Sequence, residues 1–375
     1  MSRLRLAVVG VGHLGRIHAR LAAGIGDIDL VAVVDARREA CEAVARETGC
    51  RAVGDVRELI GEIDAAVVAT PTFTHHQVAS ELIRGGVHVL VEKPIAPTVR
   101  EADELVQLAR RRCVVLQVGH VERFNPALVS VERRLSAPKY IEARRQSGYT
   151  FRSTDVGVVL DLMIHDIDVT LSLVRSPVAA ADAVGISVMG DHEDMVSARL
   201  RFENGAVANL TASRTSYAPA RTMQVFTATG FASLDFATRR ATVVEPRQDV
   251  LDRTFDAGGL SEEGRQRIRE KCFDELLVKR EAPVIESNAI EQELMDFAGA
   301  VTEGREPRVT GADGRDAVAV AELVLERVRE HQWDGASSGS RKGALVAPAA
   351  PAFAPAAADG AWATDDTVVL RRKAG

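Results

Sequence analysis

The sequence predicts an α/β chain with two folded domains: a parallel sheet covered by helices, then an α+β domain with an open, mostly antiparallel sheet. Two observations lead to this prediction. Over the first 120 residues, strand-like and helix-like segments alternate with short connections, which is the pattern of βαβ units. After Gly119 the segments are strands joined by turns, and the Asn204-Gly205 turn suits an antiparallel hairpin. We therefore expect one domain over residues 1–120 and a second over residues 121–333.

In the first domain the expected strands are short apolar runs, as in a sheet that helices cover on both faces. The expected strands are residues 4–9, 30–34, 65–69, 88–91 and 114–118. The first expected helix follows the first strand and ends at about Ala23. The second covers residues 38–48, the third begins near Thr74, and the fourth covers residues 99–110.

In the second domain we expect a long strand, a mostly apolar helix, a hairpin with further strands, and two closing helices. These are residues 140–149, 158–174, 195–202 with 206–213, strands near 223–229 and 242–245, and helices 289–301 and 316–329. From Gly335 to Gly360, 20 of 26 residues are Ala, Gly, Pro or Ser. Such a segment cannot bury enough apolar surface to offset its ordering entropy, so residues 334–375 are predicted as a disordered tail.

Composition excludes several classes of protein. The 375 residues carry a net charge of −6, which disfavours a protein that mainly binds nucleic acid. No apolar run approaches the roughly 20 residues that span a bilayer, so no membrane association is expected. The four cysteines show neither CxxC pairing nor metal-ligand spacing, and we expect free thiols in a reducing cytoplasm. They are Cys41, Cys50, Cys113 and Cys272.

The segment after the first strand has the spacing of a dinucleotide-binding turn. Gly10, Gly12 and Gly15 follow a strand and open a helix, and Asp35 ends the next strand. The first glycine allows a tight turn, and the second lets backbone N–H groups approach a pyrophosphate. The third lets the helix pack close to the strand, with its positive N-terminus facing the phosphates. This context favours a Rossmann cofactor site over a glycine turn with no ligand.

Asp35 bears on the choice of cofactor. A carboxylate at the end of the second strand can accept hydrogen bonds from the adenosine ribose hydroxyls and would repel a 2′-phosphate. This favours NAD over NADP. Arg37 and Arg38 follow directly and could neutralise such a phosphate, so NADP remains an alternative.

Lys93 lies in Glu92-Lys93-Pro94, directly after an expected strand and at the sheet edge where open α/β sheets bind ligands. Proline biases the preceding residue to an extended conformation, which directs the lysine toward the crevice. There the ammonium group could hold a substrate hydroxyl and stabilise developing negative charge. A solvated surface lysine is the alternative.

A second polar pair lies on an apolar helix. Asp161 and His165 are one helical turn apart, and Asp168 and Ser172 continue the same narrow stripe. One interpretation is a stripe that faces solvent. The other is a stripe that faces a nicotinamide ring, with His165 as general base and Asp161 orienting its imidazole. The pattern alone leaves both open.

No metal site is expected. His75 and His76 are adjacent at a helix start, so they point apart, and the surrounding sequence offers no carboxylate–His–Cys cluster.

These motifs together resemble the glucose–fructose oxidoreductase / inositol dehydrogenase / rhizopine-catabolism (Gfo/Idh/MocA) family over about residues 3–332. The resemblance implies an N-terminal Rossmann domain, an NAD(P)-dependent dehydrogenase acting on a sugar or cyclitol hydroxyl, and homodimers or homotetramers formed through the C-terminal sheet. It maps the catalytic residues to Lys93, Asp161 and His165. The cofactor contacts it implies, together with those expected from the motifs, are Gly10, Gly12, His13, Leu14, Gly15, Asp35, Thr70, Pro71, His75, Glu92 and Lys93.

Two segments, residues 118–126 and 152–168, are similar to family members that act on nucleotide sugars, in particular the UDP-N-acetylglucosamine 3-dehydrogenase-like branch. If the substrate is a UDP-sugar, arginine forks suit its diphosphate. The expected substrate contacts are Arg123, Asn125, Arg152, Asp161, His165 and Arg214. Interdomain salt bridges are an equally valid interpretation of Arg123 and Arg152.

Three alternatives stay open. The first is an inositol or free-sugar dehydrogenase of the same family. The second is a dinucleotide-binding regulator without catalysis, which would have no need for Lys93 and His165. The third is a reductase of a linear tetrapyrrole or an imine, which the Asp161–His165 pair disfavours because such relatives tend to lack it.

Overall fold

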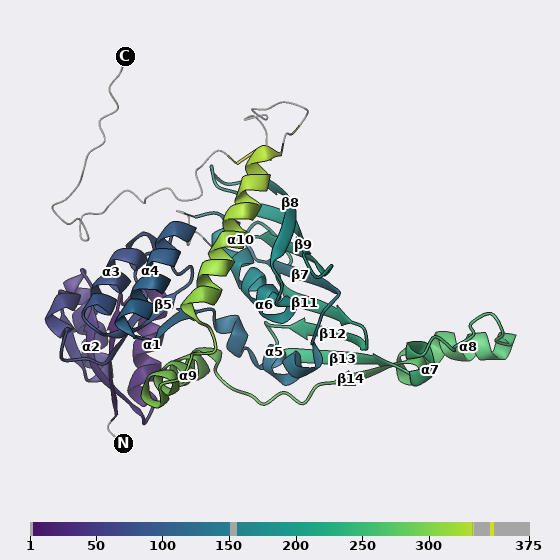
Figure 1. Cartoon of the computed structure of the whole chain (residues 1–375), viewed down its shortest axis with the longest axis horizontal. Helices are drawn as coiled ribbons and strands as arrows, with labels where there is room; N and C mark the ends of the chain where they lie inside the picture. The colour runs from purple at the N-terminus through teal and green to yellow at the C-terminus, as the bar shows by residue number, and fades with distance from the viewer. Residues whose placement is uncertain (1–2, 151–155, 332, 334–345, 349–375) are drawn as a thin grey trace, which may run out of the picture.

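The computed structural model describes residues 3–150, 156–331, 333 and 346–348, and it contains two sheets (Figure 1). The helix α10 (Gly311–Glu330) runs between the two parts of the molecule in this view. The α/β prediction is confirmed: a parallel sheet is followed by a second, mostly antiparallel one. Among the described residues, no helix is both long enough and apolar enough to cross a membrane.

The first sheet has six parallel strands in the order β3-β2-β1-β4-β5-β6. The strands are β1 (Leu4–Val9), β2 (Ile28–Val34), β3 (Arg51–Val53), β4 (Ala65–Val68), β5 (His88–Glu92) and β6 (Leu116–Gly119). The order reverses between β1 and β4, and open α/β sheets bind ligands beyond the carboxyl ends of strands at such a point. The short strand β3 was not expected from the sequence.

Four helices connect these strands. They are α1 (His13–Gly24), α2 (Arg38–Thr48), α3 (Thr72–Arg84) and α4 (Val99–Arg112). The strands β1 and β4 are almost wholly buried, as expected for a sheet covered on both faces. Expected and observed helix bounds differ by two residues at most, apart from the unassigned end of α3.

The second sheet has eight strands in the order β14-β13-β12-β11-β7-β10-β9-β8. They are β7 (Tyr140–Gln146), β8 (Val178–Ile186), β9 (Met195–Phe202), β10 (Val207–Ser213), β11 (Ala220–Thr227), β12 (Gly230–Asp235), β13 (Arg240–Pro246) and β14 (Leu277–Glu281). All neighbours are antiparallel except β7 and β10. The predicted hairpin is confirmed as β9 and β10, and Gly205 in its turn has φ +83°.

One face of this sheet is covered by helices. The expected helix over 158–174 consists of a π-helical turn (Val159–Met163) followed by α6 (Ile164–Val174). The short helix α5 (Pro126–Val131) was not expected. The expected strand over 140–149 is shorter and ends at Gln146.

The helix α9 (Ala289–Glu303) packs on the first domain although it lies near the end of the folded chain. Leu294 and Phe297 share one hydrophobic core with Leu4, Val8 and Ala19. The predicted boundary at residue 120 therefore separates residues that share a core.

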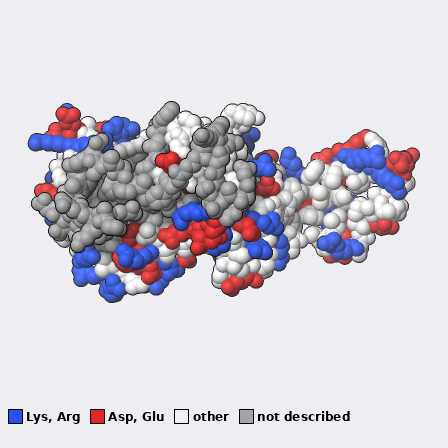
Figure 2. All heavy atoms as spheres, turned by 90° about the horizontal axis from the view of Figure 1, so that it is seen from above, with Lys and Arg blue, Asp and Glu red and all other residues white. Residues whose placement is uncertain are grey.

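An arm projects from the sheet between β13 and β14 (Figure 1). It contains α7 (Gln248–Leu251), α8 (Glu262–Lys271) and a π-helical turn (Cys272–Leu276), none of which was expected. Lys, Arg, Asp and Glu side chains are interspersed on the arm and on the rest of the visible face (Figure 2).

Of the predicted disordered tail, residues 346–348 are described and the rest lies outside the described residues. Val346 exchanges two backbone hydrogen bonds with Ser187, with N···O distances of 2.8 and 3.1 Å.

Candidate active site

The glycine turn lies at the carboxyl end of β1, where two glycines are required by packing. Gly10 has φ +88°, and a Cβ there would lie 2.7 Å from the backbone of Ala69. A Cβ on Gly15 would lie 1.7 Å from the carbonyl oxygen of Gly10. The first glycine thus permits the turn beside β4, and the third permits α1 to lie against that turn, as the motif predicts.

Gly12 differs from both, because a Cβ on it would meet no described atom within 4 Å. The adjacent His13 and Leu14 are exposed in the first turn of α1. Open space in front of the N-terminus of a 12-residue helix is what a pyrophosphate needs. The residues present therefore fit a dinucleotide cofactor.

Asp35 ends β2 beside this turn and is buried. Its Oδ2 accepts a hydrogen bond from Val11 N at 2.8 Å, and its Oδ1 accepts one from Arg37 N at 2.8 Å. The Arg37 guanidinium also donates to Oδ1, at 3.3 Å. Asp35 thus holds the glycine turn in place, and its carboxylate is at the position expected to accept the ribose hydroxyls.

Thr70 and Pro71 follow β4 at the same edge. The carbonyl oxygen of Thr70 lies 2.8 Å from Nε2 of His75, and the carbonyl oxygen of Pro94 lies 2.8 Å from Nδ1 of the same ring. His75 is buried, and burial lowers its pKa. Both ring nitrogens contact backbone oxygens, and a contact of His75 with the cofactor stays a prediction. His75 links the loop after β4 to the loop that follows Lys93.

Lys93 follows β5 and reaches the second domain. Its Nζ donates to the carbonyl oxygen of Asp161 at 2.7 Å and lies 3.4 Å from Asp161 Oδ1. The side chains of Lys93 and Asp161 are 15% and 24% exposed, so the ion pair keeps some access to solvent. The structure thus joins two of the three predicted catalytic residues, which are 68 positions apart in the sequence.

His165 begins the second turn of the same helical segment and is half-buried. Its Nδ1 is buried and has no hydrogen-bond partner among the described residues. The Asp161 carboxylate lies against Lys93, and the orientation of the imidazole by Asp161 stays a prediction. The π-helical turn at Val159–Met163 changes the spacing that an α-helix would give the pair.

The environment of His165 favours the neutral imidazole. Burial lowers its pKa well below the usual value, and the positive charges of Lys93 and Arg145 lower it further. Arg145 is itself held by a buried carboxylate, since its guanidinium donates two hydrogen bonds to Asp166. A neutral imidazole has a free lone pair with which to accept a proton.

The predicted substrate arginines lie elsewhere. Arg123 donates to Asp168 Oδ1 and to the carbonyl oxygen of Arg308, both at 3.3 Å. Arg214 is buried, donates to Asp194 Oδ1 at 2.6 Å and to the carbonyl oxygen of Val156 at 2.7 Å. Each guanidinium group thus contacts a buried carboxyl group of the protein, and a contact of either one with a substrate diphosphate stays a prediction.

Asn125 is also a structural residue. Its Oδ1 caps α5 by accepting from Ala127 N, and its Nδ2 donates to Glu122 and to the carbonyl oxygen of Phe236. Its assignment as a substrate contact stays a prediction. Arg152, the remaining predicted contact, lies outside the described residues.

Sequence reasoning missed the buried polar residues behind Lys93. His120 lies in the segment after β6, is buried, and has no hydrogen-bond partner for either ring nitrogen among the described residues. Burial, with the charges of Arg123 and Lys93, lowers its pKa to about 3. Glu92 contacts His18 and lies near Glu293. The sequence hints at this cluster only through His18, which lies three residues after Gly15 on the inner face of α1.

Comparison with known proteins agrees with this architecture. The model of the oxidoreductase family with the NAD-binding Rossmann fold matches residues 4–120, and the GFO/IDH/MocA C-terminal domain matches residues 127–233. The UDP-N-acetylglucosamine 3-dehydrogenase of Acidithiobacillus ferrooxidans is 37% identical over 322 residues, which is 86% of this chain and 96% of the relative. Its solved structure has a TM-score of 0.77 with 35% identity, covering 88% of this chain and 98% of that one.

More distant relatives share the fold. The scyllo-inositol 2-dehydrogenase (NAD(+)) of Bacillus subtilis is 30% identical over 57% of this chain and 68% of its own. Levoglucosan dehydrogenase in complex with NADH and levoglucosan has a TM-score of 0.74 at 20% identity, covering 87% of this chain and 97% of that one. The predicted NAD-binding Rossmann domain is thereby confirmed, and the chain belongs to the Gfo/Idh/MocA family of oxidoreductases.

Proposed function

We propose that the protein is an NAD(P)-dependent dehydrogenase that oxidises a secondary hydroxyl of a sugar. The observation that carries this proposal is the position of the Lys93–Asp161 pair beside the neutral His165, at the edge of the sheet where Gly12 leaves room for a dinucleotide. A regulator without catalysis would have no use for this arrangement, which is why we favour an enzyme.

The geometry supports a division of roles among three residues. His165 accepts the hydroxyl proton, because its imidazole is neutral and its side chain is only half-buried. Lys93 holds the substrate oxygen and stabilises the charge that develops on it. Asp161 fixes the Lys93 ammonium through its carbonyl and carboxylate oxygens. Bound NAD supplies the hydride acceptor, so the C–H carbon loses a hydride and the O–H oxygen a proton, giving a ketone.

The substrate we favour is a nucleotide sugar of the UDP-N-acetylglucosamine type. The 37% identical relative carries that activity in its name and matches along nearly all of both chains. Three arginines were predicted to bind the diphosphate, and two of them, Arg123 and Arg214, pair with Asp or Glu side chains of the protein. We therefore assign the diphosphate contact to the third, Arg152.

A free inositol or sugar is the second candidate. The internal use of Arg123, Asn125 and Arg214 favours it, because these residues were expected to bind a diphosphate. The 30% identical scyllo-inositol relative also supports it.

A substrate screen tests the proposal. UDP-sugars, inositols and hexoses are offered with NAD and with NADP, and reduced cofactor is followed by absorbance. Lys93→Ala and His165→Ala should each lower kcat by about 10²- to 10⁴-fold while leaving cofactor affinity unchanged. The exposed Lys139→Ala and His331→Ala serve as controls. Unchanged turnover in Lys93→Ala or His165→Ala would contradict the role given to that residue.

We also propose that the chain forms homodimers or homotetramers through the eight-stranded sheet, in the cytoplasm. The face of the sheet opposite the helices is hollowed and carries side chains of mixed charge, among them Glu142, Arg144, Asp182 and Arg199. Free Cys41, Cys50, Cys113 and Cys272 suit a reducing compartment. Light scattering of the purified protein measures the oligomer, and a monomer at micromolar concentration would contradict it.

A further inference from the structure

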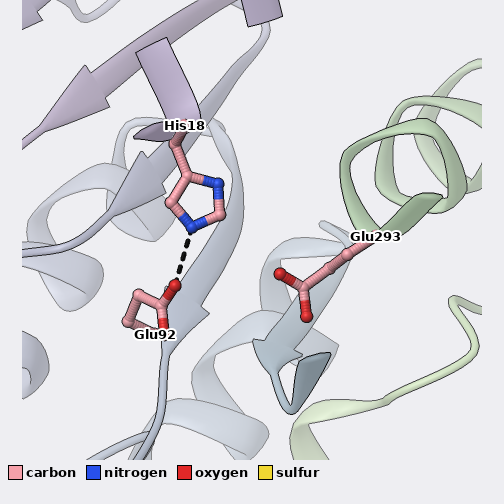
Figure 3. Close-up of side chains that lie close together, drawn as sticks. All are labelled: His18, Glu92 and Glu293. Carbon is pink, nitrogen blue, oxygen red and sulfur yellow. Dashed lines mark hydrogen bonds and ion pairs between the residues drawn. The ribbon is translucent and has the colours of Figure 1, made fainter. Parts of the chain in front are cut away.

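Three buried polar side chains from three elements lie close together (Figure 3), and one of them directly precedes Lys93 in the chain. His18 comes from α1, Glu92 from the end of β5, and Glu293 from α9. One nitrogen or oxygen atom from each lies within 4.8 Å of the others. The cluster therefore joins the helix that follows the glycine turn, the strand that carries Lys93, and the helix that returns from the second domain.

Glu92 has the contacts of a carboxylate. Its Oε1 lies 2.7 Å from His18 Nε2, a separation at which the ring donates a proton to the oxygen. Its Oε2 accepts a hydrogen bond from Lys93 N at 3.2 Å. Burial opposes ionisation of Glu92, but the hydrogen bond and charge of His18, with the charge of Lys93, outweigh it and lower the pKa.

Glu293 has the opposite environment. Its side chain is 0% exposed, and neither carboxylate oxygen has a hydrogen-bond partner among the described residues. A buried carboxylate without a partner is far more costly than a neutral carboxylic acid. Burial raises its pKa well above the usual value, and the charges of Glu92 on β5, Asp296 on its own helix and Asp168 on α6 raise it further.

We propose that Glu293 is a neutral carboxylic acid whose O–H group is directed at the Glu92 carboxylate, and that it thereby acts as a positioning residue for Lys93. A rotation about the side chain of Glu293, or one bridging water, brings the two groups to hydrogen-bond distance. Glu92 then accepts from His18, Lys93 N and Glu293, so its ionised form is stabilised without a further buried charge. The kinetic part of this inference rests on the proposed function, because it takes Lys93 as the group that holds the substrate.

The same three residues could instead ligate a divalent cation, whose charge two carboxylates would neutralise. We favour the proton, because the 2.7 Å separation of His18 Nε2 and Glu92 Oε1 is an ordinary hydrogen-bond length. Metal analysis of the purified protein decides between them. One divalent ion per chain that is lost in Glu293→Gln would overturn the proposal.

Infrared spectroscopy tests the proton directly and needs no substrate. The spectrum of the wild-type protein minus that of Glu293→Gln at pH 7 should contain the carbonyl stretch of a buried protonated carboxylic acid. Asp168, whose pKa burial raises to about 7, contributes to both spectra and cancels in the difference. Glu291→Gln, on the same helix, is the matched control and should keep the band. Absence of the band from the difference spectrum would overturn the proposal.

Kinetics tests the positioning role. In Glu293→Gln the amide can still donate to Glu92, so kcat should stay within about twofold of wild type. In Glu293→Leu the donor is lost, and kcat should fall about fivefold or more. The pKa of Glu92 then rises, which moves the acidic limb of the kcat profile to higher pH. Equal kcat and equal pH profiles in the two variants would overturn the role. If no sugar is turned over, the proposed function fails, while the infrared band still tests Glu293.

Discussion

The glycine turn of the first domain and the predicted arginine contacts of the second domain differ in how closely their structure follows the sequence prediction. Gly10, Gly12 and Gly15 have the environments that the motif requires. Arg123 and Arg214, by contrast, are bound to Asp168 and Asp194 of the protein itself.

The difference has a physical reason. A glycine motif is defined by backbone geometry and by the space a Cβ would need. At Gly15 the local turn sets this space, and at Gly10 the loop after the adjacent strand β4 sets it. An arginine pairs with any carboxylate that the tertiary fold brings near, so its role depends on distant residues. Asp194 lies 20 residues before Arg214, and Asp168 lies 45 residues after Arg123. Motifs that act through the backbone are therefore safer guides to a site than isolated charged residues.

The largest expected change in stability that tests this comparison is at Arg214. Arg214→Ala leaves Asp194 buried without its ion-pair partner, which should lower the free energy of unfolding by about 3–5 kcal/mol. Chemical denaturation measures it, and Arg201→Ala on the exposed side of β9 is the control. A stable variant with a raised KM for a UDP-sugar would instead restore Arg214 as a substrate residue.

Asp168, the partner of Arg123, should make the free energy of unfolding depend on pH, by a few kcal/mol at most. Burial raises the pKa of Asp168 to about 7, so the folded protein binds a proton that the unfolded chain releases near pH 4. Stability attributable to this group therefore falls as pH rises from about 4 to 7 and then levels off. Asp168→Asn should flatten this part of the stability curve, and exposed Asp182→Asn should not. A curve unchanged by Asp168→Asn would show that the carboxyl is ionised throughout.

A paired substitution tests the glycine turn itself. Gly15→Ala forces a Cβ against the carbonyl of Gly10 and should lower the free energy of unfolding by about 1–3 kcal/mol or more. Gly12→Ala meets open space, so it should leave thermal stability unchanged while weakening NAD binding about tenfold or more. Calorimetry and cofactor titration separate the two effects. If Gly12→Ala binds NAD normally, the pyrophosphate does not lie against this turn.

The change at Arg152 should affect substrate binding and leave stability unchanged. If the substrate is a UDP-sugar, Arg152→Ala should raise its KM at least several-fold, because a charged hydrogen bond to phosphate contributes about 1.5–3 kcal/mol, or roughly ten- to a hundredfold in affinity. Affinity for NAD should not change. Oxidation of a free hexose or inositol that matches or exceeds that of the nucleotide form would remove the reason for this role.

The fold was largely predictable from the sequence, and the side-chain contacts of the site only in part. Apolar runs and the Gly10–Gly15 turn predicted the parallel sheet, because their signals are local. The π-helical turn at Val159–Met163 was not predictable, since its residues have the apolar pattern of an ordinary helix. The pairing of Lys93 with Asp161, and the burial of Glu293 behind Glu92, depend on contacts between residues that are far apart in the chain.

The packing of α9 on the first domain also bears on how the chain is made in the cell. Leu294, Phe297 and Ala298 complete a core whose other buried members lie in the first 120 residues. At about 5–20 residues per second, the ribosome needs about 10–35 s to pass from Gly119 to Phe297. During that time the nascent domain exposes the apolar surface that α9 later covers. Glu92, which is buried in the complete structure, then lacks its neighbour Glu293 on α9. A chain released near residue 120 should therefore aggregate or bind chaperones, and co-expression of a segment containing α9 offers a way to rescue it.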